Sequence, residues 1–513
     1  MNWIQLHRLA TAVLFVSFLS AAAAQEGTTW AQEKTACAEG VLAAGTLWAN
    51  PYYIVDSGIP GPTLLIAAGI HGNEPAGFRA AEQIRHWPLK RGKLIVVPRV
   101  NTPGLREKTR WLPGVEKPDR NANRNFPGRG EPNRARTEPV RALWAFVQEQ
   151  NPDWVVDLHE GYDFRITNQK TDGSSIIFFD TPEMRALASK IHGEINATIS
   201  DPKRQFVMLH KSGPVNGGLV RAAVERLGAR GFCFETTYGK QPLSDRTRQQ
   251  RLMVHCLMGE LDMAAGSANV MISPTRSSPI RVALFDSAGI AERSVRNLER
   301  IIDSSEALEL RHVGAADVCA GVLDQFHVVV FPGGSGSKQA AALGRKGRDA
   351  VRTFVRSGGG FVGICAGAYL ATAEYDWGLA LVNAKTFTGK RLIPGEGEKS
   401  MWVRGRGTVK VELTAEGEKT FTGLPGLVEL YYANGPILSP AHCEKLAPYT
   451  TLAVYRSEIS KYDAQQGTMI DTPAIVFAGF GEGRVFLIGP HPESTDGLEP
   501  LVEQCLARAA GRR

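Results

Sequence analysis

Several features that mark specialised classes of protein are absent from this sequence. Its seven cysteines include no Cys-x-x-Cys pair, and the charged residues, 22% of the chain, form no basic block. Basic and aromatic residues do not interleave, so we expect no nucleic-acid partner. Beyond residue 24 no apolar stretch is long enough to span a bilayer. Because seven is an odd number, at least one thiol stays unpaired if the protein is exported.

The N-terminus has the pattern of a secretory signal peptide. His7 and Arg8 precede an apolar run over residues 9–24, and the alanines at 22–24 are typical of a cleavage site. The run is short for a transmembrane helix, and no cysteine follows it that could carry a lipid anchor. We therefore predict that residues 1–24 are removed from a secreted, periplasmic protein without stable membrane insertion. A membrane-anchoring helix is the alternative.

Length and composition predict two domains joined by a linker. The 513 residues, 43% of them hydrophobic, are enough for two separate cores. Composition changes once, near 264–279, where small residues, serine and proline dominate. Strand and helix patterns alternate on both sides, so we predict α/β domains at 25–263 and 280–513, each an open and mostly parallel sheet. The expected strands are 64–70, 94–100, 154–158, 231–235, 282–285, 328–331, 361–364 and 485–489, and the expected helices include 75–87, 139–150, 184–195 and 295–302.

Two histidines at the ends of predicted strands indicate a metal site. One apolar strand leads into His71-x-x-Glu74, and a second leads into His159. The carboxyl ends of parallel strands meet at one edge of a sheet, so these three side chains can converge. Two histidines and a glutamate are a ligand set of catalytic zinc, which keeps a fourth position for water. We predict one Zn²⁺ per chain; two hydrogen-bonded loop histidines are the alternative.

The stretch between these strands contains a candidate anion-binding pair. Residues 119–127 include Asn123 and Arg124. A planar guanidinium beside an amide suits a carboxylate, which the guanidinium can bind with two parallel hydrogen bonds. We interpret the pair as the binding site for a substrate carboxylate. The competing interpretation is that Arg124 braces its own loop through Asp119 or Glu131.

These motifs occur in the same order as in the M14 zinc carboxypeptidases and the related succinylglutamate desuccinylase and aspartoacylase family, which residues 45–263 resemble. The resemblance implies a zinc-peptidase-like fold in which the two histidines and their glutamate bind zinc. It also implies that Asn123 and Arg124 hold the substrate's free carboxylate. By the same resemblance Arg106 polarises the scissile carbonyl, with Arg110 as the alternative.

A carboxylate on a late strand is the candidate general base. The apolar residues 231–234 precede Glu235, and a strand-end carboxylate is costly to bury unless it is used or paired. The resemblance likewise implies a catalytic glutamate there; a salt-bridged structural glutamate is the alternative. Carboxypeptidases place a substrate-capping tyrosine shortly before this strand, whereas the loop 211–218 has none. Tyr162 or Tyr238 could replace it, and the difference favours the desuccinylase-like branch or an unusual peptidase.

The second domain contains a possible nucleophile. A strand runs into Gly363-x-Cys365-x-Gly367, where small flanking residues permit the tight turn of a nucleophile elbow. A later strand ends before His491 and Glu493, which with the cysteine make a possible Cys-His-Glu triad.

Residues 280–508 resemble class I glutamine amidotransferases, which are flavodoxin-like, and more closely the N-terminal domain of some biotin–protein ligases. The stretch around Cys365, Gly-Ile-Cys-Ala-Gly-Ala-Tyr, and the later Tyr431-Tyr432-Ala-Asn-Gly-Pro carry this resemblance. Because no synthase domain is present to receive ammonia, a binding or regulatory role stands beside an active thiol hydrolase.

Together these patterns predict a secreted zinc hydrolase that cleaves an amide bond near a free carboxylate. Its substrate is then a small peptide or an N-acyl amino acid. The enzymatic alternative is an N-acyl amino acid deacylase of the succinylglutamate desuccinylase and aspartoacylase type. The non-enzymatic alternative is a ligand-binding protein whose metal site has lost catalysis.

Overall fold

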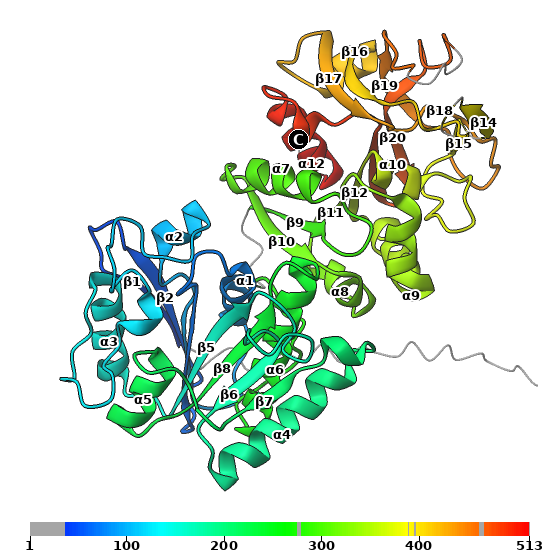
Figure 1. Ribbon diagram of the computed structural model, residues 1–513. Helices are drawn as coiled ribbons and strands as arrows, with labels where there is room; N and C mark the ends of the chain where they lie inside the picture. The colour runs from blue at the N-terminus through cyan, green and yellow to red at the C-terminus, as the bar shows by residue number, and fades with distance from the viewer. Residues whose placement is uncertain are drawn as a thin grey trace, which may run out of the picture.

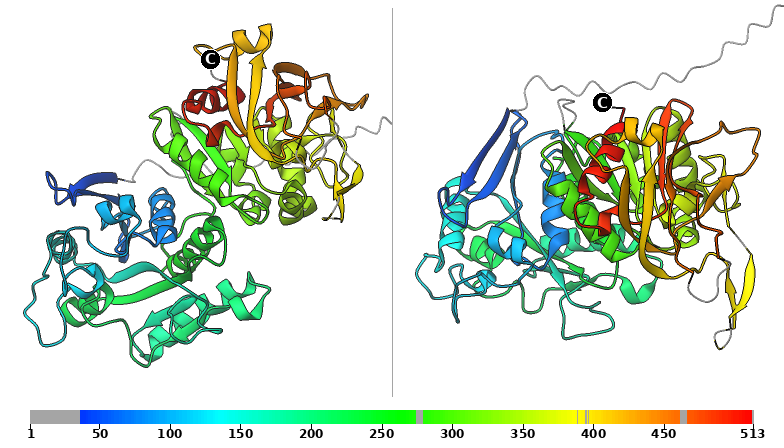
Figure 2. Two further views of the ribbon diagram at one scale, coloured as in Figure 1. Left: turned by 45° about the horizontal axis from the view of Figure 1, so that its top comes forward. Right: turned by 90° about the horizontal axis from the view of Figure 1, so that it is seen from above.

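The computed structural model describes residues 36–273, 279–387, 389–393, 395, 397–460 and 466–511. They form two domains that lie side by side (Figures 1 and 2). Each domain is a large sheet with helices on both faces, which confirms the predicted α/β class. The predicted signal peptide lies outside the described residues. Within them, no helix is both long and apolar enough to cross a membrane.

The sheet of the first domain has eight strands in the order β1-β2-β4-β3-β5-β8-β6-β7. The central four, β4, β3, β5 and β8, are parallel, and antiparallel strands extend both edges. Their buried faces are almost continuously apolar because helices cover the sheet on both sides. The strands are β1 (Ala36–Leu42), β2 (Asn50–Asp56), β3 (Thr63–Ala68), β4 (Lys93–Val97), β5 (Trp154–Gly161), β6 (Ser175–Phe178), β7 (Val207–Leu209) and β8 (Arg230–Thr237).

Helices cover this sheet in two layers. One core lies beneath α1 (Pro75–Ile84), α4 (Pro182–Ala197) and α6 (Leu243–Glu260). The other core lies beneath α3 (Glu138–Gln150) and α5 (Leu219–Leu227). The short α2 (Thr102–Glu107) follows β4.

The sheet of the second domain has nine strands in the order β10-β9-β11-β12-β21-β20-β19-β16-β17. The first five are parallel and the rest antiparallel. Helices α7 and α12 cover one face, and α8, α9 and α10 the other. The bounds are β9 (Ile280–Phe285), α7 (Glu292–Asp303), β10 (Leu308–Val313), α8 (Ala315–Cys319), β11 (Val328–Phe331), α9 (Gly336–Arg356), β12 (Gly360–Ile364), α10 (Ala366–Ala371), β13 (Ala384–Thr386), β14 (Lys390–Ile393), β15 (Gly397–Ser400), β16 (Arg406–Leu413), α11 (Ala415–Thr420), β17 (Leu427–Ala433), β18 (Leu438–Pro440), β19 (Thr450–Tyr455), β20 (Pro473–Phe480), β21 (Gly483–Ile488) and α12 (Glu499–Ala509).

The segment predicted as a linker packs against both domains in its described part. Ala264 forms a bridge with Leu89 of the first domain. Met271 is fully buried in the core of the second, and its N–H donates to Gln325 Oε1 at 2.9 Å. Residues 264–273 therefore join the two domains through fixed contacts.

Candidate metal centre and second-domain thiol site

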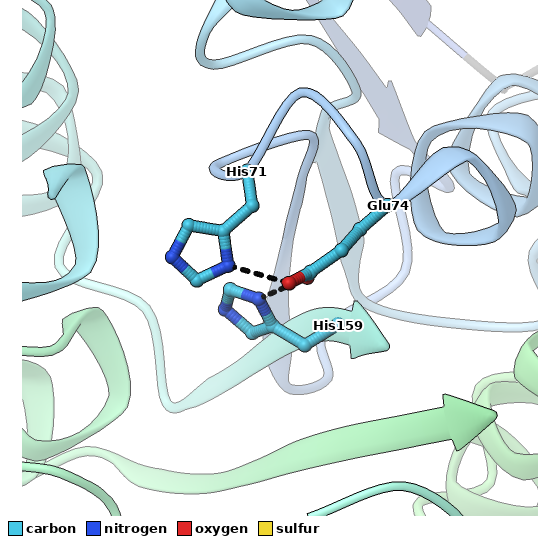
Figure 3. Close-up of side chains that lie close together, drawn as sticks. All are labelled: His71, Glu74 and His159. Carbon is cyan, nitrogen blue, oxygen red and sulfur yellow. Dashed lines mark hydrogen bonds and ion pairs between the residues drawn. The ribbon is translucent and has the colours of Figure 1, made fainter. Parts of the chain in front are cut away.

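Three side chains converge at the carboxyl edge of the first sheet. His71 follows β3, Glu74 is the residue before α1, and His159 lies within β5, one residue beyond the predicted end of that strand. All three are at least 97% buried. The Glu74 carboxylate lies between the two imidazoles (Figure 3), 2.8 Å from His71 Nδ1 and 2.9 Å from His159 Nδ1. One ligand atom from each residue lies within 4.8 Å of the others, so the cluster can hold a metal ion.

The other nitrogen of each ring is held by an oxygen. His71 Nε2 lies 3.0 Å from Asn121 Oδ1, and His159 Nε2 lies 2.8 Å from Asp157 Oδ2. A partner of this kind keeps the proton on Nε2 and leaves Nδ1 free to bind a cation. The donor set and its surroundings therefore fit zinc, which prefers imidazole and carboxylate ligands. Asp157 could have been predicted from its spacing, since residues two apart in a strand share a face.

A close backbone approach shapes the loop between His71 and Glu74. A Cβ atom placed on Gly72 would lie 2.0 Å from the carbonyl carbon of Gly104. Any other residue at position 72 would push this loop away from α2. Glycine at position 72 thus permits the tight turn that brings His71 and Glu74 together.

The charges of the clustered side chains shift one another's pKa values. Burial opposes ionisation of Glu74, but His71 and His159 outweigh it and hold the Glu74 pKa well below its ordinary value. Burial also opposes protonation of His159, yet Asp157 and Glu74 keep the His159 pKa well above its ordinary value. The carboxylate is therefore ionised at neutral pH. A cation that binds His159 Nδ1 displaces a proton there.

A cavity of about 980 Å³ opens beside the cluster and is lined by His71, Asn123, Arg124, Arg110 and Glu235. Glu235 pairs in register with the histidine on β5. Burial raises the pKa of Glu235 to about 8, against the opposing charge of that histidine. A carboxylate with such a pKa can accept a proton near neutral pH.

The predicted carboxylate-binding pair lies on the wall of this cavity. The Asn123 amide lies 3.2 Å from His159 Nε2. Arg124 donates to the Asn123 carbonyl at 2.7 Å and makes no ion pair within the described residues. Burial and then repulsion by Arg110 lower the pKa of Arg124, so two guanidiniums face the same space.

The structure does not place Arg106 at the cluster. Arg106 is exposed on α2 and lines a different cavity. Arg110, the predicted alternative, lines the cavity beside the cluster and forms an ion pair with Glu74. Lys108 has a left-handed backbone, with φ of 54°, and ends α2 between the two arginines. Neither Tyr162 nor Tyr238, the candidate capping residues, lines the cavity beside the cluster.

Glu160 has a structural position rather than a place in the cavity. Its side chain points to the face opposite His159, because neighbours in a strand alternate. It accepts hydrogen bonds from Ala76 N at 2.8 Å and from Arg246 at 2.6 Å. The glutamate thereby ties the start of α1 to α6.

The second-domain candidates also come together. Cys365 is 6% exposed and has φ of 50° and ψ of −97°, a conformation that non-glycine residues rarely adopt. His491 Nδ1 lies 2.8 Å from Glu493 Oε1, and Ser294 donates to the same oxygen at 2.7 Å. Ser294, which sequence reasoning missed, belongs to α7 and fixes the glutamate.

The free edge of His491 faces the thiol. Its Nε2 is buried and makes no hydrogen bond within the described residues. Burial opposes its protonation, but Cys365 and Glu493 outweigh burial and raise the His491 pKa to about 10. Gly333 leaves room for the ring, since a Cβ there would lie 2.7 Å from His491 Cε1. The arrangement allows a cysteine, a histidine and an orienting carboxylate to act together.

Sequence comparison agrees with this division into two units. Residues 60–258 match the family described as succinylglutamate desuccinylase/aspartoacylase catalytic domain. This part of the chain is similar to the catalytic domains of that family. Residues 322–506 match the family described as biotin-protein ligase, N terminal. The predicted fusion of these two domain types is confirmed.

The desuccinylase-type domain has similar proteins in several bacteria. N-alpha-acetyl-L-2,4-diaminobutyric acid deacetylase of Halomonas elongata is 33% identical over 114 residues, which are 22% of this chain and 32% of that protein. The chain thus spans about a third of this curated relative. Among solved structures, the mDAP-bound D,L-carboxypeptidase Csd4 of Helicobacter pylori is 22% identical (TM-score 0.34; 40% of this chain, 51% of that one). A succinylglutamate desuccinylase/aspartoacylase from Rhodobacter sphaeroides is 21% identical (TM-score 0.30; 44% and 63%).

Proposed function

We propose that the desuccinylase-type domain is a zinc-dependent hydrolase that cleaves an amide bond near a free carboxylate. One observation carries the proposal. Two buried histidines meet a single carboxylate through Nδ1, while oxygen atoms hold their Nε2 atoms, at the wall of a cavity that also contains Glu235 and Arg124. We propose further that the protein acts in the periplasm, on the strength of the N-terminal signal pattern.

The residues around the cavity divide the chemistry between them. Bound zinc would polarise the scissile carbonyl and lower the pKa of the attacking water. Glu235 accepts the proton of that water and passes it to the leaving nitrogen. Arg110 faces the same cavity and stabilises the negative charge that develops on the carbonyl oxygen.

Arg124 holds the substrate by its carboxylate. The two residues that could have braced it, Asp119 and Glu131, both pair with Arg136 instead. Asp172, a carboxylate of the same cavity whose charge acts on Arg124, pairs with Arg165. The Arg124 guanidinium is therefore available to an anion from outside the chain, with Asn123 beside it. A bidentate contact of this kind orients the amide bond as well as binding it.

The decisive experiment is to incubate the purified protein with a mixed library of short peptides and N-acyl amino acids and to identify products by mass spectrometry. We expect amide cleavage of members that carry a free carboxylate, its loss after treatment with a chelator, and its return with Zn²⁺. Release of carboxyl-terminal residues would indicate a carboxypeptidase, and release of acyl groups would indicate a deacylase. Cleavage by the metal-free protein would contradict the proposal.

The second domain supports a separate candidate function, a thiol hydrolase. The observation in its favour is the strained Cys365 opposite the unpaired Nε2 of His491. Alkylation of Cys365 by a thiol probe should be much faster than in the His491→Ala variant, because the histidine promotes thiolate formation. Equal rates in the two proteins would favour a binding or regulatory role.

A further inference from the structure

A second large cavity lies at the junction of the two domains. Its volume is about 790 Å³, within the range of small-molecule sites, which often occur at domain interfaces. Helices α1 and α2 of the first domain form one side, and α7 and β10 of the second domain form the other. Figure 1 shows these elements facing one another where the domains meet.

Positive charge dominates the lining of this junction cavity. It contains seven cationic side chains and three carboxylates, an excess of four positive charges. Three of the cations come from α7 and β10, so both domains contribute. The cations are Arg79, Arg99, Arg106, Lys108, Arg296, Arg300 and Arg311, and the carboxylates are Glu299, Asp303 and Glu309.

The carboxylates are already used by other cations of the lining. Arg79 forms an ion pair with Glu299 across the junction and lies 3.7 Å from Asp303. Arg311 lies 2.7 Å from Glu309. The other five cations of the lining form no ion pair with these three carboxylates.

Two of the remaining cations make no ion pair, and two others make only weak ones. Arg106 and Lys108 on α2 make no ion pair in the part of the chain that the structure describes. Arg296 and Arg300, four residues apart on α7, share a helix face and repel one another. Each has a carboxylate partner, Glu292 at 3.4 Å and Glu499 at 3.5 Å, but both arginine side chains are 58% exposed, so these ion pairs contribute little.

We propose that the junction cavity binds a small anion with at least two carboxylate or phosphate groups. Each wall supplies its own cations, so a ligand that carries two separated charges can neutralise both walls at once. A single carboxylate can satisfy only one wall. Because such a ligand contacts both domains, its binding stabilises their association.

The site lies directly behind the metal centre. Gly72 and Asn73, which line the junction cavity, connect His71 to Glu74. A ligand in the cavity therefore contacts the loop that positions two of the three metal-binding side chains. This consequence for catalysis rests on the proposed hydrolase function, whereas binding itself does not.

Binding can be measured on the full chain by calorimetric titration with citrate and, separately, with inorganic pyrophosphate at low ionic strength. We expect at least one probe to bind and the Arg106→Ala/Lys108→Ala variant to bind it about tenfold more weakly, a loss of about 1.4 kcal/mol. Arg296→Ala/Arg300→Ala should weaken it similarly from the other wall. The preferred probe tells whether carboxylates or phosphates are the natural groups.

Two controls keep the test specific. Arg345→Ala/Lys346→Ala removes two exposed cations of α9 outside the junction cavity and should bind as the wild type does. Arg124→Ala, which alters the cavity beside the metal centre, separates any binding there from binding at the junction: the junction variants should cause the same loss of affinity in the Arg124→Ala background. The proposal is overturned if the wild type binds neither probe, or if the α9 control weakens binding as much as the junction variants do. None of these outcomes depends on hydrolysis.

Discussion

The guanidinium of Arg251 in α6 lies 2.6 Å from Asp317 Oδ1 of the second domain, and both side chains are 1% exposed. The same guanidinium donates to Gln83 of α1 at 2.9 Å. One helix thus anchors the second domain while its Gln250 donates to the carbonyl of His159 at 2.8 Å. The domain junction and the metal centre share a structural element.

Removing one partner of this buried pair should destabilise the whole chain. Asp317→Ala leaves the Arg251 guanidinium buried without its counter-charge, so we expect the free energy of unfolding to fall by about 3–5 kcal/mol. Denaturation in urea measures this. Asp262→Ala, which breaks an exposed pair with Lys90, is the matched control and should cost at most about 1 kcal/mol. Equal losses would mean that the buried junction pair contributes no more to stability than the exposed pair does.

Metal content should depend on both histidines. His71→Ala and His159→Ala each remove a ligand, so each variant should lose the roughly one Zn²⁺ per chain that we expect in the wild type. Elemental analysis after dialysis checks this, and His192→Ala, a histidine of α4, should keep the metal. A wild type that is active without metal would disprove the prediction.

Glu235→Gln should preserve fold and zinc but lower turnover by roughly 10²–10⁴-fold, since the amide cannot accept the proton of the attacking water. The measurement is kcat on any substrate found in the library screen, with metal content determined in parallel. If turnover stays near that of the wild type, the base lies elsewhere.

Arg124 should determine the preference for a carboxylate. The wild type should have a higher kcat/KM for a substrate with a free carboxylate than for its amidated analogue. We expect a ratio equivalent to several kcal/mol of transition-state binding, because an unpaired guanidinium in the cavity is costly. Arg124→Ala should remove the difference, and Arg124→Lys should reduce it, since an ammonium cannot make the bidentate contact. If the wild type shows no such preference, the role of Arg124 is structural.

The stability of the domain junction should depend on pH through Asp245. Burial raises the pKa of Asp245 to about 6, and the nearby Asp317 and Asp286 add to the rise. The folded state therefore binds this proton more tightly than the unfolded chain, whose pKa is near 3.9. The resulting stability is complete below about pH 4 and is lost as the pH rises through about 6.

Asp245→Asn should remove this pH dependence. The variant should exceed the wild type in free energy of unfolding by about 1–2 kcal/mol near pH 8, and the difference should disappear near pH 4. Urea denaturation at several pH values measures it. A difference that is constant across this range would exclude Asp245 as its source.

Much of the metal centre could be predicted because its geometry is local. His71 and Glu74 are three residues apart after a buried strand, and His159 belongs to the adjacent parallel strand, which brings it to the same edge. Strand periodicity also directs Glu160 away from the cavity. The β1–β2 and β16–β17 hairpins were not predicted, since their half-exposed patterns carry a weaker signal than the buried central strands.

The sequence by itself determined the two α/β domains and the residue types at each site, because apolar periodicity and short spacings act within a few residues. Only the tertiary structure decided which of Arg106 and Arg110 lies beside the metal centre. Both lie in one short segment, but the left-handed turn at Lys108 directs Arg110 to Glu74 and leaves Arg106 at the domain junction. The charge around that junction arises only when α7 and α2 line the same cavity, an arrangement of segments almost 200 residues apart that no local pattern encodes.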